Sequence, residues 1–390
     1  MAVIKTYAQI NERIARGEAV VVTAEEIIAI VKEKGIEQAT REVDVVTTAT
    51  FGPMCSSGAF LNFGHSDPAI RMEKIQLNHV DAYGGLAAVD TYIGATQESD
   101  DKGWEYGGAH VICDLIDGKE VLLTATGKGT DCYPRREIRT YITKDTINEA
   151  YLYNPRNCYQ NYAAAINTSS KRLFTYMGVL NPNSSVVTYS TSGELSPLLN
   201  DPLYRTIGIG TRIFIGGTIG YVAWRGTQFK SGIGRDENDL PKSPAGTLAL
   251  IGDLKSMSTK YIQPAVFEKY GTSLYVGVGI PIPILDEDVM RHVSISNEQI
   301  TTNIFDYSVS EGPKPIVKEV NYKELRSGKV LIDGKEVKTA SLSSLSKARE
   351  IASELKAWIQ KGEFLLTEPV ELFPTDRLLN GLKIVKKGGK

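Results

Sequence analysis

The segment VDVVTTATF, from Val43 to Phe51, constrains the fold more than any other part of the chain. Its β-branched residues favour a pleated and buried strand, and a Gly-Pro pair at 52–53 follows where such a strand would end. Ahead of it, the sequence TAEE at 23–26 fits a capping box, which predicts the start of a helix that Gly35 can end. We therefore predict a helix followed by a core strand.

Four further elements are predicted from local patterns. Asp117-Gly118 is the pair favoured in a type I′ turn, so residues 110–129 are predicted to form a hairpin. The hexapeptide around this pair, IDGKEV at residues 116–121, recurs at residues 332–337 between apolar runs and predicts a second hairpin. Since an Asn-Pro pair can open a helix, we predict one over 154–166. Apolar residues at helical spacing predict an amphipathic helix over 343–361.

Strand-like and helical segments alternate irregularly along the chain, and the hairpins imply antiparallel pairing. We therefore predict an α+β fold with mixed and antiparallel sheets and flanking helices. One large catalytic domain is expected over residues 1–375, with a small C-terminal α/β subdomain over 313–375 as an option, and a tail over 376–390. The polar run 230–244 is predicted to be a long surface loop, either a lid or an insertion.

Charge and composition narrow the functional classes. The net charge is −2 and no long block of one sign occurs, which argues against a nucleic-acid partner. No uninterrupted apolar run approaches the ~20 residues of a membrane span, and the N-terminus lacks the apolar core of a secretion signal. The four cysteines form no CxxC pair and suit a reducing compartment, so we expect a cytoplasmic protein without a zinc module.

Cys55 lies directly after the predicted core strand, where folds often place reactive groups. Ser56, Ser57 and a glycine follow it, so small residues and free backbone amides surround the sulfur. Such amides can stabilise a thiolate. The alternative is an ordinary buried cysteine, and the residues alone leave both interpretations open.

Cys132, in GKGTDCYPRR, follows glycines and precedes Arg135 and Arg136. Cations near a thiol favour the thiolate, and arginine can grip a carboxylate with two hydrogen bonds. A solvated arginine pair is the alternative. His65 and His79 are candidates for general acids, or are ordinary hydrogen-bonded residues.

The other two cysteines are interpreted differently. Cys113 alternates with apolar residues on a predicted strand and is expected in the core. Cys158 lies in the first turn of the predicted helix over 154–166, where it either gains thiolate character or packs against Tyr162. An iron–sulfur cluster held by cysteines that meet only in the folded chain stays open.

Four long runs in the chain resemble one known family. They are TTATFGPMCSSGAFLNFGHSDP (47–68), LNHVDAYGGLAAVDTYIGATQ (77–97), GKGTDCYPR (127–135) and YNPRNCYQNYAAA (153–165). The chain is similar over nearly its whole length to the homocysteine biosynthesis protein family, formerly a domain of unknown function. That family is associated with L-aspartate semialdehyde sulfurtransferase activity.

The resemblance implies conversion of the aldehyde of L-aspartate semialdehyde into the thiol of homocysteine. The two cysteines characteristic of the family fall on Cys55 and Cys132, whereas Cys113 and Cys158 are not carried over. Many archaeal members continue into paired CBS domains, and regulation through such modules is not expected in this chain.

The reaction needs an external reductant, because no flavin or nicotinamide motif is apparent. The glycine-rich run 207–221 departs from the dinucleotide fingerprint, since Ile213 occupies the third glycine position. An aldehyde dehydrogenase that uses Cys55 is disfavoured for the same reason. The resemblance points instead to a small ferredoxin-like iron–sulfur partner.

We expect one cysteine, preferably Cys55, to carry sulfur as a persulfide or to attack as a thiolate. Cys132 would then resolve the intermediate through a transient disulfide. The remaining candidate roles are substrate binding and proton transfer. Substrate binding is assigned to Arg135, Arg136, Ser56 and Ser57, and proton transfer to His65 or His79.

Two alternatives remain. In the cofactor version, Cys55, Cys132 and Cys158 hold a 4Fe-4S cluster whose open iron binds sulfide. In the other, the chain is a non-catalytic scaffold that delivers iron–sulfur units or sulfur to a ferredoxin partner. A homo-oligomer is compatible with each of these hypotheses.

Overall fold

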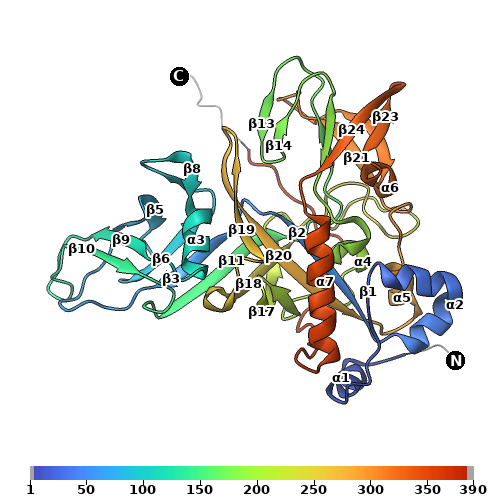
Figure 1. The fold of residues 1–390 in the computed structure, drawn as a ribbon, viewed down its shortest axis with the longest axis horizontal. Helices are drawn as coiled ribbons and strands as arrows, with labels where there is room; N and C mark the ends of the chain where they lie inside the picture. Colours follow the sequence, from blue (N-terminus) through green and yellow to red (C-terminus); the bar gives the residue numbers. More distant parts are fainter. Residues whose placement is uncertain (1–3, 384–390) are drawn as a thin grey trace.

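The computed structural model describes residues 4–383, in which helices flank one large mixed sheet and one smaller sheet (Figure 1). The predicted α+β class is confirmed. The helices are α1 (Tyr7–Ala15), α2 (Glu26–Glu42), α3 (Gly108–Ile116), α4 (Pro197–Asn200), α5 (Glu287–Val293), α6 (Tyr322–Arg326) and α7 (Leu345–Gln360).

The large sheet joins sixteen strands within residues 4–383. Its main path runs β1-β2-β20-β16-β17-β18-β11-β3-β6-β5-β4-β9-β10, with β19 paired to β20 and β7 and β8 attached beside β5. These strands are β1 (Val21–Thr23), β2 (Val45–Pro53), β3 (Gly58–Asn62), β4 (Lys74–Leu77), β5 (Val80–Tyr83), β6 (Asp90–Gly94), β7 (Glu98–Ser99), β8 (Gly103–Gly107), β9 (Val121–Thr126), β10 (Glu137–Ile142), β11 (Glu149–Asn157), β16 (Arg212–Ile215), β17 (Thr218–Arg225), β18 (Leu248–Asp253), β19 (Ile262–Phe267) and β20 (Gly271–Pro283).

The smaller sheet has the order β22-β21-β12-β15-β24-β23, and a separate hairpin pairs β13 with β14. Residues 313–375 do not build this sheet alone, because β12 and β15 come from the middle of the chain, and α7 packs against β2 and β20 of the large sheet. The strands are β12 (Ala164–Ile166), β13 (Leu173–Thr175), β14 (Gly178–Leu180), β15 (Val186–Tyr189), β21 (Thr301–Asp306), β22 (Ile316–Asn321), β23 (Lys329–Ile332) and β24 (Lys335–Ser341).

The core strand predicted over 43–51 is confirmed as β2. It pairs in antiparallel register with β20 along its whole length and in parallel with β1. Two of its buried threonine hydroxyls find backbone acceptors: Thr47 donates to Ala352 O on α7 (2.9 Å) and Thr48 to Ile280 O (2.7 Å). The burial of polar side chains in this strand is therefore compensated by hydrogen bonds.

Three other local predictions hold in the structure. The capping box is present, with reciprocal bonds between Thr23 and Glu26, although Gly35 kinks α2 and the helix continues to Glu42. The second Asp-Gly pair, 333–334, closes the β23–β24 hairpin with positive φ at both positions. The amphipathic helix over 343–361 is α7.

The hairpin predicted over 110–129 is wrong, because its first half is α3. The apolar residues of this segment also recur at helical spacing, and they pack into the main core from a helix. Asp117 and Gly118 end α3 rather than joining two strands, with Gly118 at φ 73°. Cys113 is buried as predicted, on a helix instead of a strand.

The helix predicted over 154–166 is also wrong. This segment continues β11 as far as Asn157 and then forms β12. Pro155 is tolerated in the strand because the pairing with β18 is irregular at this point, as at a β-bulge.

Within residues 4–383, no helix is both long and apolar enough to span a bilayer.

Candidate functional site

Cys55 lies in a tight turn that connects β2 to β3. Ser57 N donates to Met54 O (3.0 Å), so Cys55 and Ser56 occupy the two central positions of this turn. Met54 N donates to Leu274 O (2.7 Å) and fixes the turn to β20. The Cys55 side chain is half-buried, so the thiol is held by a rigid sheet and remains accessible.

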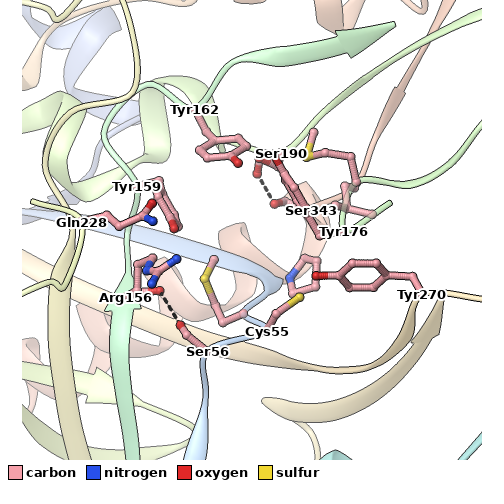
Figure 2. Close-up of a pocket in the computed structure, with 14 residues that line it drawn as sticks. Cys55, Ser56, Arg156, Tyr159, Tyr162, Tyr176, Ser190, Gln228, Tyr270 and Ser343 are labelled. Atoms are coloured by element: carbon pink, nitrogen blue, oxygen red, sulfur yellow. Dashed lines mark hydrogen bonds between the residues drawn. The ribbon is translucent and has the colours of Figure 1, made fainter. Parts of the chain in front are cut away.

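The Cys55 turn forms one wall of a cavity of about 280 Å³ (Figure 2). The other walls come from β11 and the segment after it, the turn of the β13–β14 hairpin, the β19–β20 turn and the segments that follow β15, β17 and β24. The lining residues are Pro53, Met54, Cys55, Ser56, Arg156, Tyr159, Tyr162, Tyr176, Met177, Ser190, Gln228, Tyr270, Leu342 and Ser343.

Two neutral hydroxyl groups lie beside the Cys55 sulfur. Ser273, fully buried on β20, donates to Cys55 Sγ (3.2 Å). Tyr270, in the β19–β20 turn, lies beside the thiol in Figure 2. Burial, together with the adjacent Cys55, raises the pKa of Tyr270 to about 12, so its phenol stays protonated at neutral pH. Both groups can therefore donate hydrogen bonds to a charged sulfur or to an oxygen bound beside it.

Arg156 enters the cavity from the irregular part of β11. Its backbone N donates to Asn154 Oδ1 (3.0 Å), and its side-chain Nε donates to Thr227 Oγ1 (3.1 Å). Ser56 Oγ donates to Arg156 O (3.4 Å) and connects this strand to the Cys55 turn. In the part of the chain that the structure describes, Arg156 is the one charged side chain that lines the cavity.

A cluster of tyrosines forms the wall opposite Cys55. Tyr159 and Tyr176 each pack edge-to-face on Tyr162, with ring centroids 4.8 and 6.4 Å away. The Tyr176 hydroxyl is hydrogen-bonded to Tyr307 (2.9 Å) behind this wall. Burial raises the pKa of Tyr162 far above its usual value, so this wall is neutral.

Two of the sequence runs quoted above meet at this site. Asn154 Nδ2, from the run 153–165, donates to the buried Ser57 Oγ (2.9 Å), from the run 47–68. Ser57 therefore supports the turn rather than lining the cavity, whereas Ser56 lines it.

Cys132 lies elsewhere, in the exposed loop 127–136 between β9 and β10. Three strands, β6, β5 and β4, separate β9 from β3, which follows the Cys55 turn. The pairing register puts the two cysteines at opposite ends of these strands. Cys55 precedes the first residue of β3, whereas the Cys132 loop lies level with the last residues of β3 and beyond them. A direct disulfide between them within one chain would require movement.

Of the other predicted site residues, two lie near Cys132 rather than Cys55. His65 stacks on Tyr133 with ring centroids 6.2 Å apart. Arg135 donates to two backbone carbonyls, Asp67 O (2.8 Å) and Pro68 O (3.0 Å), and so fixes the Cys132 loop.

Arg136 and His79 do not reach the cavity either. Arg136 is exposed at the base of the Cys132 loop. His79 is exposed in the tight turn between β4 and β5, with φ 63°. The structure thus brings Ser56 and Ser57 to Cys55, and places the four predicted basic residues elsewhere.

The three predicted cluster ligands do not come together in one chain. Cys158 is buried in the core at φ 50°, between β11 and β12, so it does not lie at a helix N-terminus as predicted. Burial raises the pKa of its thiol well above the usual value. In the part of the chain that the structure describes, no group of three or more His, Cys, Asp or Glu residues is placed to hold a metal ion. This arrangement does not fit a cluster held by Cys55, Cys132 and Cys158 of one chain.

Several site residues were not identified from the sequence. Arg156, Tyr159 and Tyr162 belong to the run YNPRNCYQNYAAA, whose arginine and tyrosines were an available signal beside its cysteine. The remaining ones, Tyr176, Tyr270 and Ser273, come from distant segments with no local signature.

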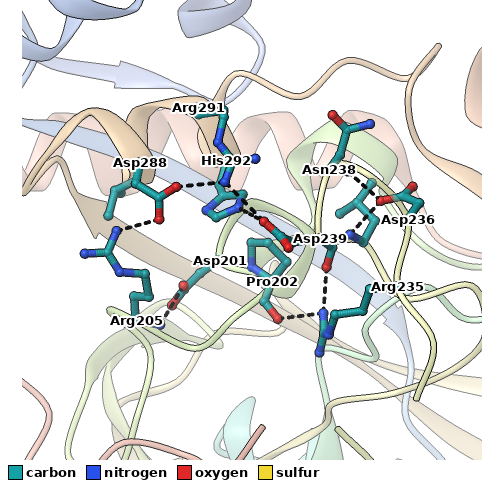
Figure 3. Close-up of polar contacts among 12 residues, drawn as sticks. Asp201, Pro202, Arg205, Arg235, Asp236, Asn238, Asp239, Asp288, Arg291 and His292 are labelled. Carbon is teal, nitrogen blue, oxygen red and sulfur yellow. Dashed lines mark hydrogen bonds and ion pairs between the residues drawn. The ribbon is translucent and has the colours of Figure 1, made fainter. Parts of the chain in front are cut away.

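The predicted surface loop 230–244 is not a free lid. Asp239, in this loop, is hydrogen-bonded to the buried His292 on α5 (2.9 Å) and ion-paired with Arg291 (3.1 Å), as Figure 3 shows. Arg235 donates to Pro202 O (3.0 Å) and fixes the loop to the α4 region. These contacts make the loop part of the folded body.

Comparisons with known proteins match these motifs to one family. Residues 19–366 match the family described as homocysteine biosynthesis enzyme, sulfur-incorporation. The chain is 54% identical over 367 residues to the L-aspartate semialdehyde sulfurtransferase of Methanosarcina acetivorans, covering 94% of this chain and 71% of that protein. It is 53% identical over 384 residues to the protein of the same name from Methanocaldococcus jannaschii, covering 95% and 73%.

A more distant relative, an uncharacterized protein of Methanothermobacter thermautotrophicus, is 30% identical over 334 residues, covering 83% of this chain and 72% of that protein. No solved structure matches the chain. Because the family match spans most of the chain and the two closer relatives are covered over more than two thirds of their length, the chain belongs to the homocysteine biosynthesis enzyme family.

Proposed function

We propose that this protein is an L-aspartate semialdehyde sulfurtransferase that makes homocysteine in the Cys55 cavity. The observation that carries the proposal is the accessible Cys55 thiol in a small cavity with one cation and several neutral hydroxyl donors. A volume of about 280 Å³ suits a short amino-acid aldehyde rather than a nucleotide cofactor. The names of the two closer relatives support the same substrate.

The overall reaction replaces the aldehyde oxygen by sulfur and then reduces the product. Addition of a sulfide-level sulfur to the aldehyde carbon gives a hydroxythiol, and loss of water gives a thioaldehyde. Two electrons and two protons convert the thioaldehyde into the thiol of homocysteine. The electrons come from an external donor, which we propose to be a ferredoxin-like iron–sulfur protein in the cytoplasm.

Cys55 can carry the sulfur through a cycle in which its own oxidation state is restored. Cys55 and Cys132 are free thiols in this structure, so the cycle is primed once by a small disulfide, which oxidises them to a Cys55–Cys132 disulfide and is itself reduced to two thiols. Sulfide then attacks the Cys55–Cys132 disulfide, which yields a Cys55 persulfide and a free Cys132 thiol. The persulfide adds to the aldehyde carbon, and its proton passes to the carbonyl oxygen. Cys132 then attacks the Cys55 sulfur, releases the hydroxythiol and re-forms the disulfide, so the cycle consumes electrons only in the later reduction of the thioaldehyde.

The site supplies what the addition step needs. Tyr270 and Ser273 are neutral donors beside the sulfur, so they can stabilise negative charge as it develops on sulfur or oxygen. The resolving step needs Cys132 close to Cys55, which requires either movement of the loop 127–136 or a second copy of the chain.

Anaerobic turnover with purified protein tests the proposal. The protein is first oxidised with a small disulfide; L-aspartate semialdehyde, sulfide and a reduced ferredoxin are then supplied, and homocysteine is measured by mass spectrometry. We expect wild-type protein to form homocysteine and Cys55→Ala to form none, with Cys113→Ala, in the core, as a control for loss of a thiol. Homocysteine formation by Cys55→Ala at the wild-type rate would refute the proposed site. No product from the wild type would favour the non-catalytic scaffold instead.

A further inference from the structure

The Cys55 cavity has an unbalanced charge. Within residues 4–383, Arg156 is the one charged side chain that lines the cavity, and no carboxylate lines it. The guanidinium donates from Nε to Thr227, and the side chain lines the cavity beside Tyr159 (Figure 2). Burial raises the pKa of Tyr159, and the nearby Arg156 guanidinium lowers it in part. The positive charge therefore lies beside the tyrosine wall. Such a cavity favours an anionic ligand.

The backbone of β11 is adapted to present this side chain. Asn154 pairs with Leu250 and Asn157 with Leu248, so three steps along β11 match two along β18. This extra residue is the signature of a β-bulge, which re-aims side chains next to functional sites. Pro155 O also accepts from Thr227 N (2.9 Å), so both the strand and its neighbouring loop hold Arg156 in place.

We propose that Arg156 binds the carboxylate of the aldehyde substrate, an inference that rests on the proposed function of the same cavity. The carboxylate and aldehyde carbons of L-aspartate semialdehyde are separated by three bonds, or about 4 Å. The residue that holds the carboxylate must therefore share one small cavity with the reacting thiol. Arg156 and Cys55 meet this condition.

The arginines predicted from the sequence do not meet this condition. Arg135 is bonded to the carbonyls of Asp67 and Pro68, and Arg136 is exposed near Cys132. A planar guanidinium can give a carboxylate two parallel hydrogen bonds, which orients the substrate as well as binding it. Arg156 is thus the specificity-determining residue for a substrate with an α-carboxylate.

Three aldehydes that differ by one charged group test the proposal. L-aspartate semialdehyde carries both the carboxylate and the ammonium, succinate semialdehyde lacks the ammonium, and 3-aminopropanal lacks the carboxylate. For Arg156→Gln we expect kcat/KM to fall by about 10- to 150-fold with the first two, the loss typical of a hydrogen bond to a charged group. With 3-aminopropanal we expect a change of less than about 3-fold, and Arg156→Lys should lie between.

Arg225→Gln is the matched control, because Arg225 also belongs to the large sheet but stacks on the exposed Trp224. It should leave all three kcat/KM values unchanged. An equal loss with all three aldehydes in Arg156→Gln would mean that Arg156 only supports the fold, and would overturn the proposal.

Binding of L-homoserine separates this proposal from the proposed function. L-homoserine has the same carboxylate and ammonium but no aldehyde, so its affinity reports the anchor without any chemistry. By calorimetry, we expect binding to wild type and Cys55→Ala, and at least about 10-fold weaker binding to Arg156→Gln. Equal affinity for wild type and Arg156→Gln would overturn the role of Arg156, whatever the turnover assay of Cys55→Ala shows.

Discussion

The hydrogen bond from Ser273 to Cys55 predicts a specific change in thiol reactivity. Ser273 is fully buried and its hydroxyl lies 3.2 Å from Cys55 Sγ, so in Ser273→Ala bulk water has little access to replace the lost donor. A hydrogen bond to a charged group contributes about 1.5 kcal/mol at the lower end of its range. Losing it should raise the free energy of a negatively charged Cys55 sulfur by a similar amount, which is roughly a tenfold effect in an equilibrium constant.

The observed alkylation rate should change less than this equilibrium. A thiolate that is less stabilised is also more nucleophilic, and the Brønsted dependence returns about a threefold gain for each tenfold loss of thiolate. Alkylation of Cys55 in Ser273→Ala should therefore be about 3-fold slower than in wild type at neutral pH. In the high-pH range where the alkylation rate no longer rises with pH, the same variant should react about 3-fold faster.

The assay is iodoacetamide alkylation of Cys55, followed by peptide mass spectrometry in a Cys132→Ser background because Cys132 is exposed. Thr272→Val is the control, since the Thr272 hydroxyl is equally buried on the same strand but donates to Ala95 O (2.7 Å). If Ser273→Ala reacts at the wild-type rate at both pH values, the hydrogen bond does not stabilise the thiolate and the reasoning is wrong.

Two further predictions concern folding. Gly108→Ala should destabilise the protein by more than about 3 kcal/mol in denaturant unfolding, because a Cβ there would lie 1.9 Å from Gly94 O. Gly234→Ala is the control: its Cβ would meet nothing within 4 Å, so the free energy of unfolding should change by less than about 0.5 kcal/mol. The hydrogen bond from His292 lowers the pKa of Asp239, so the stability it adds is present above about pH 4 and lost as the pH falls through the lowered value. Asp239→Asn should therefore lower the melting temperature at neutral pH, with the difference shrinking in acid; a constant difference would contradict this.

Sequence patterns predicted elements where one local signal dominated. The turn at 333–334 and the helix α7 formed as predicted, because positive φ and an apolar stripe at helical spacing each favour one structure. The segment 110–116 was ambiguous, since a short apolar run fits a buried strand or a buried helix equally well. The Asn-Pro pair at 154–155 lies at a bulge in β11 and does not start a helix. Pairing with β18 determines this structure, and local sequence patterns carry no information about that pairing.

The same distinction applies to the site. Cys55 could be placed because a strand end is a local feature, and the structure keeps it in a turn between two strands. Arg135 and Arg136 are close to Cys132 in the sequence, but closeness in sequence is a poor guide to a cavity that is formed by strands far apart in the chain. The tyrosine wall and Ser273 depend on long-range packing, so sequence patterns alone could not predict them.

The positions of Cys55 and Cys132 also predict how they can form a disulfide. The Cys132 loop is fixed at its base by Gly127 N to Arg136 O (2.8 Å) and by three bonds from Arg135 to the segment 67–69. Moving Cys132 to Cys55 within one chain would break these bonds and still leave three strands between them. An exposed loop can instead reach the cavity of a second copy without breaking its own contacts.

We therefore expect any Cys55–Cys132 disulfide formed under mild oxidation to join two chains. On a non-reducing gel, wild-type protein should give a dimer band whose cross-linked peptide contains both cysteines. Cys55→Ser and Cys132→Ser should each lose this band, and an equal mixture of the two variants should regain it, since each supplies the thiol that the other lacks. A Cys55–Cys132 peptide recovered from monomer would show that the loop 127–136 moves within one chain, despite the bonds that hold it.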